Sequence, residues 1–571
     1  MMTSPARRVT SYFTPYLLAV AAALWISARS TAGEPSVRAA KRPIAKNVIV
    51  LIVDGCSSEQ YTLARWHKGE PLALDAIRVG AVKTHIADSV IADSAAAASA
   101  YATGVRTGGQ IISLTPKTTT VGDASAPSRA LQPMATVLEG ARLLGKATGI
   151  VATSSVTHAT PAAYMAHAPS RNDLDDIMEQ AVYQNVDVVL GGGTSSLLPE
   201  EQGGLRRDRE NLAEVLHVHG YRLPRTRDAL MQIEAGKVFG TFADEHMAAE
   251  CDRPEVAPQE PSLAEMTEKA IELLAGDPEG FFLMVEASQV DWACHASDPA
   301  QLLSDLAMYD RVVKLALDFA KRDGETLVLA LSDHNTGGMS IGNRATDKSY
   351  GHTSVEDLVG PLRNMKRSAK TLWAKLGNDL TIAKVKTVVA EYWGLQISDA
   401  DAGDVLDVAA GYGQGSKHSA LGEVLCPRHT CLGWTTHGHA GGDVPLHAFG
   451  PGRPVGVVDG PDVAKITAAA LGLDLERLNR RLFREATEAL PGADVTLEQP
   501  TPQNFVVKVE HGGRTARLPA NKNLLQLDDR TIELEGVVVC VRDGQTPTAY
   551  LPMQAVKLIT RAAEPLPAVV P

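Results

Sequence analysis

Residues 47–55 have the sequence NVIVLIVDG, and this stretch decides the fold that we expect for the chain. Asn47 to Val53 form a continuous run of mostly β-branched residues, which is typical of a strand buried on both faces. The run ends directly in Asp54 and Gly55. In open α/β sheets, ligands bind outside the carboxyl ends of the strands. The stretch therefore predicts both a buried central strand and the edge of the sheet at which a site would lie.

Strand-like and helix-like segments alternate on the C-terminal side of this run. Helical periodicity or capping residues mark the ranges 134–144, 173–183, 263–274, 298–321 and 462–471. Apolar runs typical of strands occupy the ranges 148–152, 186–190, 281–285, 326–331 and 444–449. This alternation predicts an α/β fold, with a mostly parallel central sheet and helices on both of its faces.

Two regions depart from the alternation. Residues 340–430 have weak periodicity and many glycines, and we expect them to form an inserted cap region within a catalytic domain that spans 47–490. Residues 500–571 contain short strand-like runs separated by turns, for example 504–510 and 537–541. They predict a small all-β C-terminal domain whose role the sequence does not indicate.

The composition excludes several classes of protein. The chain has 571 residues, 44% hydrophobic and 21% charged, which is typical of a globular protein and not of a disordered chain or a small disulfide scaffold. Its formal net charge of −12 argues against a nucleic-acid partner, because nucleic-acid-binding domains carry basic surfaces. Aromatic residues make up only 5% of the chain, which also disfavours the stacking of bases.

Residues 1–32 have the pattern of a secretory signal peptide. Arg7 and Arg8 form a basic segment, residues 16–26 are apolar, and Ser30 to Ala32 are small residues suited to cleavage. The apolar run is short for a bilayer span of about 20 residues, so we favour a cleaved signal over an uncleaved anchor. We therefore expect a polar linker over 33–46, export to the periplasm or the extracellular space, and no stable membrane span after cleavage.

Export also implies an oxidising compartment, in which cysteines pair. Cys426 and Cys431 lie close together in what we expect to be a loop, and a disulfide between them is the favoured interpretation. The alternative is a zinc site that includes His429. It is less favoured, because one histidine and two cysteines fall short of four ligands.

Acids and histidines gather at the predicted strand ends. They are Asp54, Glu286, Asp291, His295, Asp333, His334 and His439. A single carboxylate after a strand is usually a turn or capping residue, but crowded carboxylates repel one another unless cations are present. Mixed aspartate and histidine ligation suits zinc, and seven such groups exceed one tetrahedral site. The pattern predicts at least two metal ions.

Ser94 and Arg171 are the two further candidates. Ser94 precedes the alanine-rich segment 95–98, at the start of a predicted helix. It is either a helix-capping residue or a nucleophile activated by a metal. Arg171 follows Pro169 and Ser170, and a guanidinium at such a position could bind two phosphate oxygens, although an isolated arginine is usually only a surface residue.

Taken together, these segments resemble the alkaline phosphatase family. The matching segments are 53–55, 93–95 with 101–104, 158–162 continuing to 170–171, 286–288 with Asp291 and His295, 332–338, and 436–441 with Asp443. They follow one another in the order of the family over roughly 45–475. The set is much more specific than any one short motif.

The resemblance implies hydrolysis of phosphate monoesters to an alcohol and inorganic phosphate, through a phosphoserine on Ser94, with Arg171 clamping the phosphate. It implies two zinc ions and a third metal, usually magnesium. Asp54, Asp333 and His334 would hold one zinc, Asp291, His295 and His439 the second, and Asp54, Thr160 and Glu286 the third metal. His437 is a rival to His439, which is preferred because residues 439–441 match the family motif. The resemblance also allows a homodimer.

Two positions near the third metal depart from part of the family. Some members have an acid in place of His158 and a lysine in place of Trp292, so magnesium, zinc and cobalt all stay open for this metal. Three other functions are weighed. The first is a phosphodiesterase of the same superfamily, which often uses threonine as its nucleophile, whereas this chain has serine. The second is a sulfatase, which needs a motif that residues 95–98 lack. A secreted phosphate- or metal-binding protein without turnover is the third.

Overall fold

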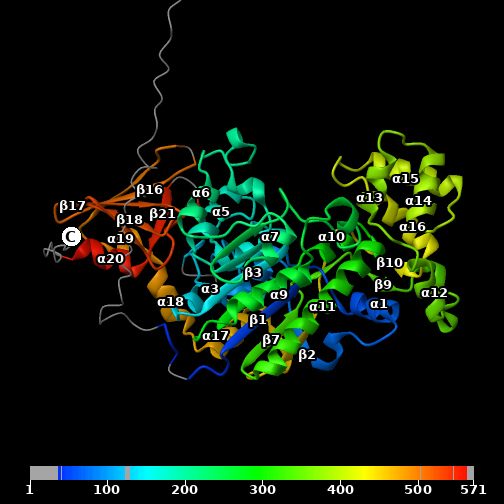
Figure 1. Ribbon diagram of the computed structural model, residues 1–571, viewed down its shortest axis with the longest axis horizontal. Helices are drawn as coiled ribbons and strands as arrows, with labels where there is room; N and C mark the ends of the chain where they lie inside the picture. Colours follow the sequence, from blue (N-terminus) through cyan, green and yellow to red (C-terminus); the bar gives the residue numbers. More distant parts are fainter. Residues whose placement is uncertain (1–36, 40–41, 123–128, 502, 544–545, 562–571) are drawn as a thin grey trace, which may run out of the picture.

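A nine-stranded sheet forms the centre of the computed structural model, which describes residues 37–39, 42–122, 129–501, 503–543 and 546–561 (Figure 1). The strands lie in the order β13-β2-β12-β7-β1-β6-β3-β4-β5. Their bounds in chain order are β1 Asn47–Val53, β2 Arg78–Lys83, β3 Ala147–Ser155, β4 Val188–Gly192, β5 Val238–Thr241, β6 Phe281–Ala287, β7 Thr326–Leu331, β12 Val444–Phe449 and β13 Gly456–Asp459. Of these, β12 alone runs against its neighbours, β2 and β7. The prediction of a mostly parallel sheet is confirmed.

Alternate residues of β1 feed two hydrophobic cores on the opposite faces of the sheet. Ile49, Leu51 and Val53 pack into the core that includes residues of α1 (Ser58–Lys68), α9 (Leu263–Leu274) and α11 (Pro299–Asp323). Val48 and Val50 pack into the other core. That second core is covered by α3 (Val137–Leu143), α5 (Leu174–Tyr183) and α17 (Gly460–Leu471). Every residue of β1 is buried, as the sequence predicted for a central strand.

Three strands of the sheet were missed in the sequence, namely β2, β5 and β13. They are short, and β2 and β13 lie at one edge with several exposed residues, so that no apolar run marks them. Close approach of their backbones requires glycine, because a Cβ atom on Gly80 would lie 1.7 Å from the carbonyl oxygen of Gly456.

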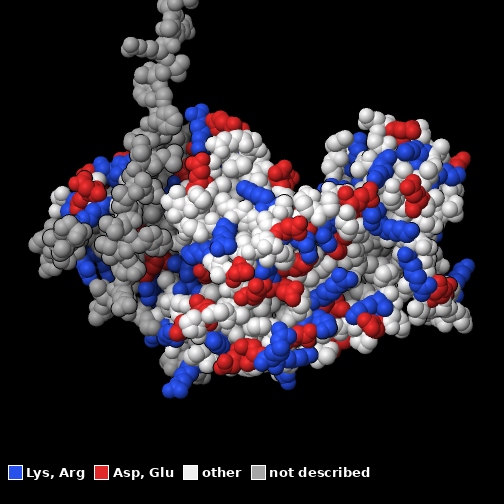
Figure 2. Space-filling view, in the orientation of Figure 1, with Lys and Arg blue, Asp and Glu red and all other residues white. Residues whose placement is uncertain are grey.

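The region expected as an inserted cap is a helical lobe at the right of Figure 1. Its helices are α12 (Val355–Val359), α13 (Ala369–Leu376), α14 (Ile382–Tyr392), α15 (Asp399–Ala410) and α16 (Ser419–His429). Trp393 is fully buried, and its indole nitrogen donates to the carbonyl oxygen of Arg367 at 2.9 Å. The lobe shares a hydrophobic core with one face of the sheet, and a notch separates its outer part from the central body in Figure 2.

The disulfide expected between Cys426 and Cys431 is wrong, because both cysteines are free thiols. Cys426 lies on α16 and not in a loop, and its thiol donates to the carbonyl oxygen of Ser297 at 3.2 Å. Cys431 lies beyond the end of the helix, and its thiol donates to the backbone carbonyl oxygen of Asp357 at 3.4 Å. The imidazole of His429 contacts Asp401 at 3.2 Å, so the alternative of a zinc site has no support either.

The C-terminal strands form two small sheets at the left of Figure 1. One contains β15 (Asp494–Glu498), β16 (Val506–His511), β17 (Arg514–Pro519), β18 (Leu524–Leu527) and β19 (Arg530–Glu533). The other contains β14 (Arg484–Glu485), β20 (Val539–Asp543) and β21 (Thr546–Leu551). Two helices, α19 (Ala486–Ala489) and α20 (Met553–Thr560), accompany them, so this part of the chain is not purely β.

The expected signal peptide at 1–32 lies outside the described residues. Of the expected linker at 33–46, the described residues pack against the end of α17. The amide nitrogens of Ile44 and Ala45 donate to the carbonyl oxygen of Ala470, at 2.9 and 3.0 Å. Within the described part of the chain, no helix has the length and apolar character needed to cross a bilayer.

Candidate active site

Three adjacent strands, β7, β1 and β6, end side by side and carry the acids that the sequence singled out. Asp54 follows β1, Glu286 is the last residue but one of β6, and Asp333 and His334 follow β7. Ile52 pairs with Glu286 on one side and with Leu331 on the other, so the three strand ends are level. All four side chains are fully buried. The parallel register therefore brings together residues that are far apart in the sequence.

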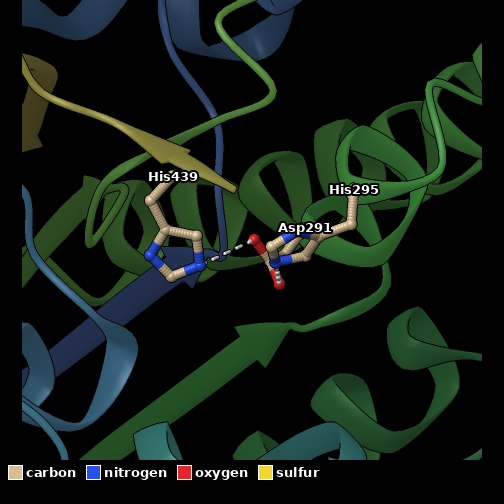
Figure 3. Close-up of side chains that lie close together, drawn as sticks. All are labelled: Asp291, His295 and His439. Atoms are coloured by element: carbon tan, nitrogen blue, oxygen red, sulfur yellow. Dashed lines mark ion pairs between the residues drawn. The ribbon is translucent and has the colours of Figure 1, made fainter. Parts of the chain in front are cut away.

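A helix and a short strand complete this edge with a second group of ligands. Asp291 and His295 lie one turn apart on α10 (Gln289–His295), and His439 begins β11 (His439–Ala440), as Figure 3 shows. The imidazole Nε2 of His295 lies 3.2 Å from Asp291 Oδ2. The imidazole Nε2 of His439 lies 3.8 Å from Asp291 Oδ1. Their ligand atoms are close enough to share one metal ion.

Backbone carbonyls fix which nitrogen of each histidine can bind a metal. Nδ1 of His439 lies 2.7 Å from the carbonyl oxygen of Ala92, which can only accept, so Nδ1 carries a proton and Nε2 keeps its lone pair. His295 has the same arrangement through the carbonyl oxygen of His437. The His437 ring itself faces Glu423, with Nε2 at 3.4 Å from Oε2. The geometry therefore groups His439, and not His437, with Asp291.

Ser94 lies against a second group, formed by Asp54, Asp333 and His334. The hydroxyl oxygen of Ser94 is 3.1 Å from Nε2 of His334. That nitrogen is also 3.1 Å from Asp333 Oδ2 and 3.5 Å from Asp54 Oδ1. The other carboxylate oxygen of Asp333 accepts the backbone N–H groups of Gly55 and His334 at 3.1 and 3.0 Å. These backbone bonds fix Asp333 with its other oxygen toward His334.

A third group joins Asp54 to His158 and Glu286, whose possible ligand atoms lie within 4.8 Å of one another. His158 is the N-cap of α4 (Ala159–Met165), and Thr160 lies in the first turn of the same helix. The Thr160 hydroxyl is buried and has no hydrogen-bond partner in the part of the chain that the structure describes. Burial and the charge of Arg171 lower the pKa of His158 to about 3, so its ring is neutral at any ordinary pH.

The electrostatics of these groups fit bound cations. Burial, together with the neighbouring carboxylates, raises the pKa of Asp54 well above its usual value, and burial raises the pKa of Glu286 to about 7. Among the described residues, both oxygens of Asp54, Oε1 of Glu286 and Oδ2 of Asp333 are buried without hydrogen-bond partners. Buried carboxylate oxygens are normally satisfied. Cations bound between these oxygens would supply the missing partners and remove the repulsion.

Ser94 is the first residue of α2 (Ser94–Thr103), and its helix is capped by Asp93. The carboxylate of Asp93 accepts the backbone N–H of Ala96 at 3.3 Å, so the alternative of Ser94 as the N-cap is wrong. The Ser94 side chain is left free to face His334, at a helix N-terminus that favours anions. Arg171 approaches the same place, with Nη1 at 3.4 Å from Asp93 and Nη2 at 2.9 Å from Nε2 of His158.

Two residues at the site were missed by sequence reasoning. The hydroxyl of Thr336 donates to Asp291 Oδ1 and also lies 3.2 Å from Nδ1 of His334. It therefore connects the group of residues that contains Asp291 and His439 with the group that contains His334. Because Thr336 lies only two residues after His334, its position in the sequence could have marked it as a residue of the site. The His246 ring packs at 4.5 Å from the Trp292 ring, between centroids, and accepts the Ser155 N–H at 3.0 Å. Nothing in the sequence around His246 marked it.

Comparisons with known proteins identify the family of the chain. The family model described as Alkaline phosphatase matches residues 45–473. The chain is 34% identical over 449 residues to Alkaline phosphatase 3 of Bacillus subtilis, covering 76% of this chain and 90% of that protein. It is 30% identical to Repressible alkaline phosphatase of Saccharomyces cerevisiae, covering 71% and 76%. Among solved structures, alkaline phosphatase from Thermus thermophilus superposes with a TM-score of 0.66 at 29% identity, covering 78% of this chain and 97% of that one.

Proposed function

This chain belongs to the alkaline phosphatase family and is a phosphomonoesterase, and on that premise we propose that Ser94 is the nucleophile of its reaction. One observation carries the proposal. The Ser94 hydroxyl lies 3.1 Å from His334, beside buried carboxylate oxygens that have no hydrogen-bond partner. A serine in such surroundings, at a helix N-terminus, is placed to attack an anionic phosphate group once cations are bound.

We propose three cation sites, with two zinc ions and a third ion, usually magnesium. Asp291, His295 and His439 would hold one zinc, and Asp54, Asp333 and His334 the other. Asp54, Glu286 and Thr160 would hold the third cation, and His158 lies close enough to join them. When bound, such cations would lower the pKa of the serine hydroxyl and of water, and would offset negative charge on the transferred phosphoryl group.

The chain's own residues account for the rest of the reaction. The Ser94 oxygen forms a bond to phosphorus as the bond to the alcohol oxygen breaks, and the alcohol leaves with a proton. Water then attacks the phosphorus of the phosphoserine, which frees Ser94 and gives inorganic phosphate. Arg171 would bind two phosphate oxygens through its guanidinium in both steps. Asp93, at 3.4 Å from that guanidinium, keeps it turned toward the start of α2.

The test is hydrolysis of a chromogenic phosphate monoester at alkaline pH by the full chain, with and without a chelator. We expect activity that needs metal and that is lost in Ser94→Ala. The matched control is Ser99→Ala on the same helix, a buried serine whose hydroxyl bonds the carbonyl oxygen of Ile111 and lies outside the metal groups. Acid quenching with mass spectrometry should find phosphate on Ser94.

Two results would contradict the proposal. Turnover that persists in Ser94→Ala would remove the serine from its role. Activity on phosphate diesters in preference to monoesters would favour the related diesterase reaction. We also propose export of the protein, on the basis of residues 1–32 alone, and a signal-peptide cleavage product found by N-terminal sequencing would support it.

A further inference from the structure

The turn between β17 and β18 is one of the places where the C-terminal strands dock onto the catalytic part of the chain. Asn521 and Lys522 lie in this turn and reach α5, the helix that begins three residues after Arg171. This part of the chain lies beyond residues 45–473, which the family model matches. The contact therefore joins a segment outside the family match to the neighbourhood of the proposed phosphate-binding arginine.

Lys522 inserts its ammonium group into a cluster of acids. Glu179, Asp208 and Glu210 lie close enough together to hold a cation, and Nζ of Lys522 lies 3.1 Å from Glu179 and 2.6 Å from Glu210. The side chain of Lys522 is only 15% exposed. The cluster is thus an ion-pair anchor for the C-terminal strands and not a further metal site.

Asn521 makes the more specific contact. Its amide nitrogen donates to Asp176 at 2.9 Å and to Glu179 at 3.1 Å. Its amide oxygen accepts from the Gln180 side chain at 3.1 Å. The backbone φ of Asn521 is +64°, a left-handed conformation that asparagine tolerates better than most residues. All the polar atoms of this side chain therefore face α5.

The side chain of Gln180 connects Asn521 with the segment that carries Arg171. Its side chain accepts the backbone N–H of His167 at 2.9 Å and donates to the carbonyl oxygen of the same residue at 3.0 Å. Gln180 is 1% exposed and His167 is 2% exposed, so no water competes for these bonds. The backbone of His167 is thereby held by a side chain that Asn521 itself holds.

From His167 the chain runs to Arg171 along a fixed path. Ala168 exchanges two backbone hydrogen bonds with Ile112, both of 3.0 Å. The backbone N–H of Arg171 donates to the carbonyl oxygen of Gln110 at 2.8 Å, and the N–H of Gln110 donates to Asp93 at 3.2 Å. This path begins at Asn521 in the C-terminal strands and ends at the guanidinium of Arg171, which contacts Asp93, the residue before Ser94.

We propose that Asn521 is a positioning residue for phosphate binding, which acts through Gln180 and the backbone of residues 167–171 on Arg171. The proposal rests on the proposed function in one respect, namely that Arg171 binds the phosphate. It assigns a role to the C-terminal strands in holding the phosphate-binding arginine in place.

The test compares two variants of the full, metal-loaded chain. Asn521→Gly keeps the left-handed backbone and removes the side chain. Asp528→Gly is the matched control, because Asp528 also has a positive φ, of +56°, but its carboxylate accepts from Arg514, another residue of the C-terminal strands. We expect the dissociation constant of inorganic phosphate, measured by calorimetry, to rise about threefold to tenfold in Asn521→Gly, as for the loss of about one hydrogen bond. It should stay unchanged in Asp528→Gly.

Further readouts separate positioning from a merely structural role. We expect the KM of a phosphate monoester to rise with the phosphate constant, and the backbone amides of residues 168 and 171 to exchange hydrogen faster. A lower melting temperature with unchanged phosphate affinity would overturn the proposal. If Asn521→Gly does not fold, Gln180→Glu breaks the same link from the side of α5 and is judged by the same readouts.

The two proposals fail in different ways. A wild-type chain that binds phosphate without turning over a monoester would contradict the proposed function, while the positioning role would still be decided by the phosphate affinity of Asn521→Gly. A wild-type chain that binds no phosphate would overturn both.

Discussion

Replacing Glu286 with glutamine should stabilise the protein once its metals have been removed, although Glu286 is a proposed metal ligand. Burial raises the pKa of Glu286 from 4.5 to about 7. The folded state therefore holds this proton more tightly than the unfolded chain does. The contribution of Glu286 to stability is full below pH 4.5 and is lost as the pH rises toward 7, because the folded state must then bury a charge.

The size of the effect follows from the difference between the two pKa values. Going from 4.5 to about 7 corresponds to about 3 kcal/mol at pH 8, at about 1.4 kcal/mol for each pKa unit. Residues 45–473 form the matched catalytic part. With an unfolding entropy of about 2.1 cal/mol/K per residue, about 3 kcal/mol over a unit of this size raises the melting temperature by about 3–4 °C.

The assay is thermal unfolding, followed by circular dichroism, after exhaustive chelation at pH 5 and pH 8. Glu286→Gln should melt above the wild type at pH 8, with little difference at pH 5. With zinc and magnesium present the order should reverse at pH 8, because a neutral amide is a weaker ligand for a hard cation. A chelated variant that melts no higher than the wild type at pH 8 would refute the reasoning.

A second buried carboxylate provides the control. Glu139 is fully buried but accepts from Thr136 and Gln184 and pairs with His167 at 3.2 Å. Although burial opposes it, the charge of His167 lowers the pKa of Glu139. Glu139→Gln should therefore destabilise the chelated protein at pH 8, opposite in sign to Glu286→Gln. Two substitutions of the same chemistry then compare Glu286, whose Oε1 is buried without a hydrogen-bond partner among the described residues, with Glu139, which pairs with a histidine.

Three further predictions follow from the site and the core. Arg171→Ala should weaken the binding of inorganic phosphate about 10-fold to 100-fold, which corresponds to the free energy of hydrogen bonds to a charged group. Calorimetry measures this affinity, and an unchanged value would exclude Arg171 as the phosphate-binding residue. His295→Ala should lose about one zinc ion per chain in elemental analysis, since four-ligand zinc sites tolerate few deletions; an unchanged zinc content would place the ion elsewhere. His447→Gln should make the stability of the chelated protein less sensitive to acid. Burial lowers the pKa of His447 from 6.5 to about 4. The stabilising contribution of His447 is therefore full above pH 6.5 and falls by about 3 kcal/mol as the pH drops toward 4. Urea unfolding at pH 4.5 and pH 7.5 checks this, and equal losses in both proteins would contradict it.

Strands buried on both faces were the easiest elements to predict. The runs at 47–53, 326–331 and 444–449 match β1, β7 and β12 residue for residue, because a strand that is buried on both faces must be mostly apolar. The helix expected at 263–274 also matches α9, whose capping box at Ser262 and Glu265 marks its start. The direction of β12 was not predictable, since antiparallel and parallel strands can have the same apolar run.

Residues with chemical roles were recognisable in the sequence where they follow a strand or lie one helical turn apart. Asp54 and Asp333 needed only the rule that strand ends carry ligands, and Asp291 with His295 needed only the helical period. Gly55 was also marked, and the structure supplies the reason. Its φ is +74°, and a Cβ atom there would lie 2.7 Å from a carboxylate oxygen of Asp291.

The sequence by itself determined the type of fold, the family and the set of residues that could bind metal, because each depends on local patterning. The tertiary structure alone decided which of these groups meet. It placed His439 beside Asp291, set His158 between Glu286 and Arg171, and brought Asn521 to α5. Such contacts depend on the register of distant strands and on which carbonyl or carboxylate each side chain reaches after the chain has folded. No local pattern encodes those distances, because they are fixed by packing between segments hundreds of residues apart.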